Sequence, residues 1–292
     1  MNYCVSVWLV MAMLWCGAAS AAEFPTDEPG VIAYLRDRGL QITLDGEGHA
    51  VRLMSSGQPV LTADEYQLIG KLSHLEQMGL NAAPLKGDEW DFLHQLPQLK
   101  TLSIWHGHHF ATLQPFCGLP VESLTIGGCM GLRDFNQENP DQLRNAIVTL
   151  KDLPQLKKGN WYHSPLIPDD AHLRHIATNF PALEDLRLDF AAPRGSATNI
   201  TPDGLAVLQS LPLKVLSLEN AGTFEVGHMR SLADIQTLEA VLIDARRQPG
   251  PSEAGLKAFR QWRPDVTVVT TNPGDKQPPV YRPGKARQTA AN

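Results

Sequence analysis

One short pattern recurs along this chain and restricts its fold more than any other feature. The segment LPLKVLSLEN carries Leu213, Leu216 and Leu218, so its apolar residues are spaced by three and then by two. A helical face needs gaps of three or four residues, and a half-buried strand needs gaps of two. Related segments, with apolar residues at relative positions 1, 4 and 6, begin at Leu75, Leu99, Val121, Leu183 and Leu238.

Helix signals alternate with these copies, one of which is degenerate: it begins at Leu156 and has Gly159 and Trp161 at positions 4 and 6. Thr62 and Glu65 have the spacing of a capping box, and the segments NPDQLRNAIVTL, IPDDAHLRHIA and TPDGLAVLQSL place proline in a first helical turn. Positions 4 and 6 share the inward face of a strand, and position 1 lies in the preceding bend. One such coil cannot bury its apolar side alone, so we expect the coils to stack as a solenoid.

The pattern changes at both ends of the repeats. Residues 22–60 predict an N-terminal cap, in which the helix VIAYLRDRGL precedes a hairpin, QITLDGEGHAVRLM, that turns at Asp45-Gly46. The repeat domain is expected at 61–271 and closes with an atypical strand, VTVVTT. Residues 272–292 are rich in proline and poor in apolar residues, so we expect disorder there.

The copies resemble a known family. LxxLxL followed by a helix, with TPDGLAVLQSLPLKVLSLEN as the best copy, is similar to the leucine-rich repeats, above all the helix-containing ribonuclease-inhibitor and F-box types and their exported bacterial relatives. The resemblance covers about residues 61–270. It implies an α/β right-handed solenoid of about seven repeats, with a parallel sheet on the concave side and helices on the convex side.

The N-terminus has the composition of a secretory signal peptide. Residues 5–19 are apolar or small except Ser6, and the small residues ASA at 19–21 suit cleavage after Ala21. Export with cleavage of residues 1–21 is the favoured interpretation, and retention of the segment as an anchor is the alternative. A cleaved protein would be periplasmic or secreted, with no membrane segment left.

Charge and motif content exclude several function classes. The formal net charge of −6 provides no general basic field for nucleic acid. The sequence contains no GxSxG, Walker-type loop, HExxH or glycine-rich dinucleotide turn. We therefore expect a protein that is not an enzyme and that has no cofactor.

The candidate binding residues lie on the outward face of the expected strands. Positions 3, 5 and 7 should form an exposed stripe, because positions 4 and 6 point inward. Aromatic residues and arginine contribute much of the binding energy at interfaces. The stripe and the adjoining loop therefore predict the following partner-binding residues: Trp105, His106, Tyr162, Arg187, Asp189, Glu219 and Asp244.

Histidines and cysteines leave alternatives open. The segment WHGHHF crowds His106, His108 and His109 at a strand exit, and His163 lies at a matching exit, so these four are weak candidates for a metal site. Cys129 matches position 9, where the leucine-rich repeat family carries Asn or Cys, which favours buried free thiols over a disulfide with Cys117.

The favoured function is binding of a protein partner on the concave face by a protein that we expect to be monomeric. Two alternatives remain. One is a metal-binding or metal-dependent protein that uses the His106 cluster. The other is a purely structural protein of the cell envelope, which would tolerate any substitution on the stripe.

Overall fold

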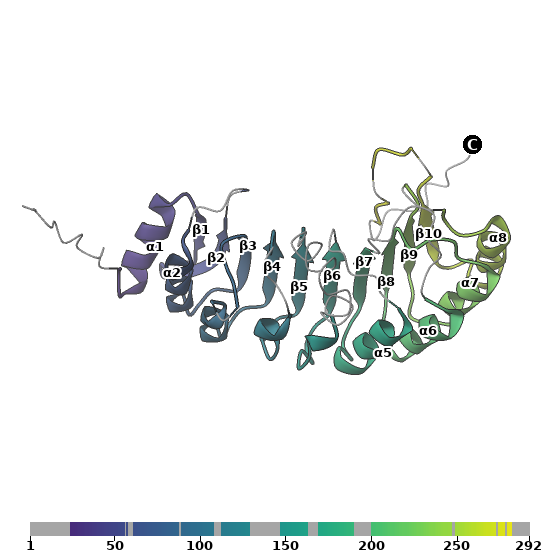
Figure 1. Ribbon diagram of the computed structural model, residues 1–292, viewed down its shortest axis with the longest axis horizontal. Coiled ribbons are helices and arrows are strands. Elements are labelled where there is room, and N and C mark those ends of the chain that lie inside the picture. The colour runs from purple at the N-terminus through teal and green to yellow at the C-terminus, as the bar shows by residue number, and fades with distance from the viewer. Residues whose placement is uncertain are drawn as a thin grey trace, which may run out of the picture.

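The computed structural model describes residues 24–55, 57, 61–87, 89–107, 112–128, 147–162, 169–189, 200–246, 249–272, 274–277 and 279–281. Within them, ten strands form one sheet in the order β1 to β10, and the coils lie side by side along an arc (Figure 1). The strands are β1 (Gln41–Leu44), β2 (Ala50–Met54), β3 (Gln77–Asn81), β4 (Thr101–Trp105), β5 (Ser123–Gly127), β6 (Lys158–Tyr162), β7 (Asp185–Asp189), β8 (Val215–Glu219), β9 (Ala240–Asp244) and β10 (Thr267–Thr270). The chain is a repeat solenoid.

The repeat pattern predicted the strands correctly. Each strand from β3 to β9 occupies relative positions 3 to 7 of a copy, and neighbouring strands pair in parallel without offset, as in Leu216 opposite Leu186. The closing strand β10 pairs Val268 with Val241, so Val268 takes position 4. It packs against the core, as position 4 does in the other coils.

The core consists of the apolar residues that define the pattern. Leu213, Leu216 and Leu218 have no exposed surface, and the matching residues of the other coils are buried with them in one continuous cluster. Burying a leucine side chain contributes about 1.5–3 kcal/mol. The three-then-two spacing is therefore the mark of a strand with its preceding bend, both of which face the core.

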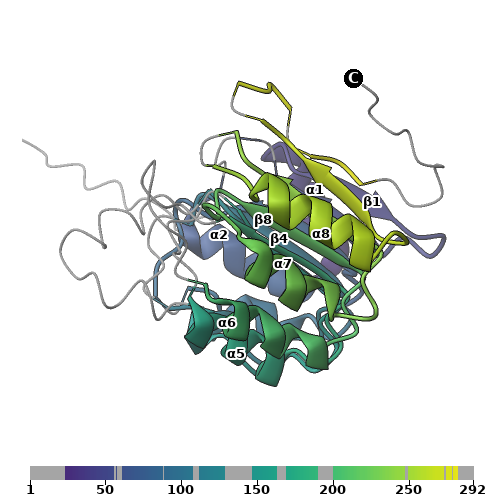
Figure 2. The ribbon, with the colours of Figure 1, turned by 90° about the vertical axis from the view of Figure 1, so that its right-hand side faces the viewer.

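The described helices follow the outer, convex side of the arc (Figures 1 and 2). They are α1 (Glu28–Asp37), α2 (Ala63–Gln67), α5 (Asp170–Asn179), α6 (Pro202–Ala206), α7 (Val226–Ala233) and α8 (Glu253–Trp262). Single 3₁₀ turns supplement or replace them: η1 (Leu68–Lys71), η2 (Asp91–Gln95), η3 (Gln114–Phe116), η4 (Ile147–Thr149) and η5 (Val207–Ser210). The predicted capping box of Thr62 and Glu65 opens α2. None of the described helices is long and apolar enough to span a membrane.

The N-terminal cap contains the predicted helix and hairpin. Helix α1 precedes β1 and β2, which pair antiparallel, and β2 then pairs in parallel with β3. Asp27 caps α1 by accepting a hydrogen bond from the backbone N–H of Gly30. The hairpin therefore continues the repeat sheet and forms its first edge. The signal segment 1–21 lies outside the described residues.

The degenerate copy that begins at Leu156 still forms a strand of the sheet, because the large side chain of Trp161 makes up for the missing side chain of Gly159. A Cβ atom on Gly159 would lie 2.4 Å from Cζ3 of Trp161, so the indole ring fills the space that position 4 fills elsewhere. Trp161 is buried and stacks on Phe180 at a centroid distance of 6.3 Å. One large side chain at position 6 thus replaces two leucines.

This exchange predicts strong coupling between the two positions. Gly159→Leu should collide with the indole ring, and Trp161→Leu should leave a cavity, each at a cost of about 2 kcal/mol in the free energy of unfolding. The double variant restores the leucine pair of the other coils and should lie within about 1 kcal/mol of the wild type. Urea denaturation measures all four proteins. Losses that simply add in the double variant would contradict the exchange.

Candidate functional site

The outward face of the sheet is open in its middle and closed toward its C-terminal end. Across β4 to β6 the outward side chains are at least partly exposed, apart from Gly127: Thr101, Ser103, Trp105, Ser123, Thr125, Lys158, Asn160 and Tyr162. On β8 and β9 all outward residues except Val215 are buried: Ser217, Glu219, Ala240, Leu242 and Asp244. The expectation of a uniformly exposed stripe was wrong for this half.

Trp105 is one of two aromatic side chains on the open part. Its ring extends over the neighbouring strand, where a Cβ atom on Gly79 would lie 3.1 Å from Cζ3 of the indole. The end of the Met54 side chain lies over the same glycine, 2.5 Å from that position. Glycine at this point leaves room for the indole, and Trp105 is partly exposed.

Tyr162 lies in the same way over Gly127 of β5. A Cβ atom there would lie 2.3 Å from the phenol ring. From β7, the other neighbour of β6, the Arg187 guanidinium lies 5.3 Å from the ring centroid, which is a cation–π distance. Arg187 in turn donates from Nε to Glu219 at 2.5 Å and forms an ion pair with the same carboxylate. The phenol thus lies over a glycine and close to a guanidinium that Glu219 fixes.

Three carboxylates occupy position 7 on adjacent strands, where Asp189 lies opposite Glu219 and Glu219 opposite Asp244. All three were expected to be exposed, and all three are buried. They are buried because neighbouring side chains bind them. Asn220 donates to Asp189 at 2.7 Å, and Arg187 binds Glu219.

Asp244 is bound by an arginine and a threonine. Arg246 Nε donates to both of its oxygens at 2.9 Å, and the Thr271 hydroxyl donates at 2.9 Å. Burial alone would raise the pKa of the Asp244 carboxyl, but the hydrogen bonds from Arg246 and Thr271 lower it below its usual value. Asp244, the last of the three position 7 acids, therefore stays ionised.

Burial dominates at Glu219. It raises the pKa of the Glu219 carboxyl, the charge of Arg187 opposes the rise, and the charges of Asp189 and Asp244 add to it. The C-terminal half of the sheet thus contains three buried carboxylates, Asp189, Glu219 and Asp244, that bind neighbouring side chains and are not free charges on the surface.

The predicted histidine and cysteine sites are described only in part. His106 adopts a left-handed backbone conformation, with φ of 60°, and its ring lies 3.2 Å from the place of a Cβ atom on Gly128. His108, His109, His163 and Cys129 lie outside the described residues. Cys117 has a free thiol, which donates to the carbonyl of Thr149 at 3.2 Å.

A charge pattern that the apolar spacing does not reveal lies at position 2, just before each strand. Its residues alternate in sign: Glu76, Lys100, Glu122, Lys157, Glu184, Lys214 and Glu239. Three ion pairs join them, with N–O distances of 2.9 Å for Glu76–Lys100, 2.8 Å for Glu122–Lys157 and 2.7 Å for Glu184–Lys214. We call this set the charge row.

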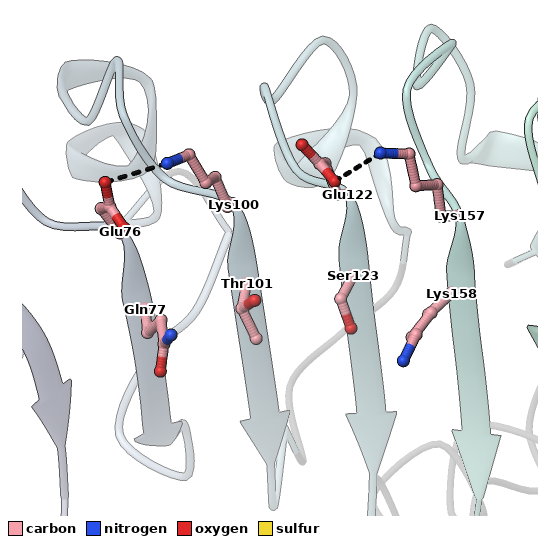
Figure 3. A pocket seen from close by; sticks show the side chains of 8 residues that line it. All are labelled: Glu76, Gln77, Lys100, Thr101, Glu122, Ser123, Lys157 and Lys158. Carbon is pink, nitrogen blue, oxygen red and sulfur yellow. Dashed lines mark hydrogen bonds and ion pairs between the residues drawn. The ribbon is translucent and has the colours of Figure 1, made fainter. Parts of the chain in front are cut away.

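The first four residues of the charge row line a pocket of about 330 Å³ with the position 3 side chains Gln77, Thr101, Ser123 and Lys158 (Figure 3). Hydrogen bonding to Lys157, followed by its charge, lowers the pKa of Glu122, and the same pair raises the pKa of Lys157. The copies LEQMGLN, LKTLSIW and VESLTIG show the alternation directly, so the sequence contained the signal.

No protein-family model matches this sequence, and no curated protein does. Among solved structures, the chain is similar to one in the crystal structure of the Rad7 and Elc1 complex in yeast, with 17% identity and a TM-score of 0.47. The match covers 75% of this chain and 62% of that chain. A likeness at this level carries no information about a partner or an activity.

The charge row predicts a salt-sensitive stability effect. Lys157→Glu places a third carboxylate between Glu122 and Glu184, so the melting temperature should fall. The loss should shrink in 1 M NaCl, where the screening length is only about 3 Å. Lys276→Glu makes the same charge change at an exposed residue outside the row and should have little effect. Equal losses for the two variants at low salt would contradict the role of the row.

Glu219 predicts a pH effect of defined sign. Its folded pKa lies above the unfolded value, so its contribution to stability is largest below the unfolded pKa, about 4.3, and is lost as pH rises through the folded pKa. Glu219→Gln does not titrate at this position. The stability of the wild type relative to this variant should therefore decrease between pH 4 and pH 7 in thermal melts. Glu253→Gln on α8 is the control, and a relative stability that rises with pH would contradict the assignment.

Proposed function

We propose that this protein binds a protein partner on the concave side of its sheet, over β4 to β7, without catalysing a reaction. The observation that carries the proposal is the pair Trp105 and Tyr162, two partly exposed aromatic side chains that each lie over a glycine of the neighbouring strand. Large rings with one polar atom are the side chains that anchor protein interfaces. Thr101, Ser103, Ser123 and Thr125 add partly exposed hydroxyls to the same face of β4 and β5.

The residues predicted for the partner then divide into two groups. Trp105, Tyr162 and Arg187 present surface to the partner, with His106 at the rim. Glu219 holds Arg187, while Asp189 and Asp244 bind Asn220 and Arg246. Side chains that are already held lose less conformational entropy on binding, and this increases affinity.

We propose also that the protein is exported and that its coils are leucine-rich repeats. The apolar segment 5–19 and the small residues before Ala22 support secretion to the periplasm or the exterior. The LxxLxL copies support leucine-rich repeats of the exported bacterial kind, about seven of them in a right-handed coil. In this proposal the protein acts as a monomer, because the concave face is kept for a different chain.

Replacing both anchors tests this function. Trp105→Ala with Tyr162→Ala should reduce capture of a specific partner at least tenfold, because interface aromatics contribute 2 kcal/mol or more each. The measurement is quantitative affinity capture from the native host with wild-type and variant baits, after circular dichroism has shown that both are folded.

Trp262→Ala is the matched control, because this indole is exposed on convex helix α8 beside Arg230. The control should capture the partner as the wild type does. If the double variant retains every partner that both other baits capture, the concave face is not the binding surface.

A further inference from the structure

Two segments of the N-terminal cap and one of the first repeat coil bring a carboxylate and two imidazoles together. Glu28 stands in the first turn of α1, His49 ends the turn between β1 and β2, and His74 lies just before β3. The Nδ1 atom of His49 lies 3.0 Å from Glu28 Oε2, and the Nδ1 atom of His74 lies 3.9 Å from the same oxygen. One ligand atom from each residue falls within 4.8 Å of both others.

This donor set suits a first-row transition metal. Two imidazole nitrogens and one carboxylate oxygen are ligands of zinc, iron and copper. Tetrahedral ligands at the usual zinc distances are separated by about 3.4 Å, so the donor atoms lie near the required spacing, and one of the two stacked imidazoles must turn for both to point at the same ion. The three side chains are 18% to 38% exposed, which leaves room for water at the remaining coordination positions.

The surroundings orient the donors. The second oxygen of Glu28 accepts a hydrogen bond from the Ala50 N–H at 3.0 Å, which fixes the carboxylate toward the imidazoles. Such outer contacts are typical of ligating carboxylates. The rings of His49 and His74 stack at a centroid distance of 3.8 Å. Neutral imidazole is the form that binds metal.

The helix cap and the apolar core do not require this cluster. Helix α1 is already capped by Asp27, and neither histidine belongs to the apolar core. His49 also has Glu47 nearby, with Nε2 3.8 Å from its carboxylate. A second carboxylate therefore lies near the site on the side of the hairpin.

We propose that Glu28, His49 and His74 form a binding site for a transition-metal ion of the zinc class, which joins α1, the hairpin and the first repeat coil. The site is independent of the concave face. It differs also from the histidines around His106: His74 lies just before a strand, whereas His106 follows one, and the two sites use different segments.

Calorimetric titration of the full chain with zinc chloride at pH 7.5 tests the site. We expect one equivalent to bind here, and His49→Ala and His74→Ala should each weaken that binding at least tenfold. His94→Ala, at an exposed histidine on η2, should leave it unchanged. Zinc should also raise the melting temperature of the wild type but not of the two variants. Magnesium, which prefers oxygen ligands, should not bind.

His74→Gln keeps a polar side chain at the site and serves as a second variant, and circular dichroism in EDTA establishes that each variant is folded. Cobalt should give a visible absorption band with the wild type that His74→Gln lacks. A wild type that binds no zinc would overturn the site. Zinc binding of full strength in both His49→Ala and His74→Gln would overturn it as well.

Discussion

Everything in this molecule depends on the burial of positions 1, 4 and 6 between successive coils. Leu183, Leu186 and Leu188 have almost no exposed surface, and neither have the matching leucines of the next coil. No coil can bury these residues alone, so each needs its neighbours, and the strands pair without offset along β3 to β9. Parallel strands lie about 4.8 Å apart. Any relative position in the repeat therefore becomes a row of adjacent side chains across the sheet.

These rows explain how residues far apart in the chain act together. At position 2, Glu and Lys alternate, so each charge has neighbours of opposite sign, whereas a uniform row would repel itself. Exposed pairs stabilise little one by one, and the row matters through the repulsion that it avoids. At position 7, aromatic rings stand in the middle of the sheet and acids toward its end. The same geometry thus yields a charge row, an aromatic surface and a supported acidic end.

The spacing of apolar residues was enough to predict the strands and their inward faces, because the periodicity reflects burial directly. It did not predict the exposure of Glu219 or Asp244. Their burial depends on Arg187, Arg246 and Thr271, which belong to other coils or lie outside the pattern. The alternation at position 2 was visible in the quoted copies but has no periodicity within one segment. The cluster of Glu28, His49 and His74 joins three segments, so only the packing of the cap reveals it.

The open and closed halves of the sheet are connected through Arg187. Tyr162 lies over Gly127 and close to Arg187, and Arg187 is fixed by Glu219, which is itself buried. The closed half therefore sets the position of a side chain on the open half. Burial raises the pKa of the Glu219 carboxyl, so keeping it ionised costs free energy of folding. In return, the carboxylate holds a guanidinium close to a partly exposed ring. In the proposed binding function the acids act from within the sheet: removing Glu219 should release Arg187 and Tyr162 while leaving the contact surface chemically intact.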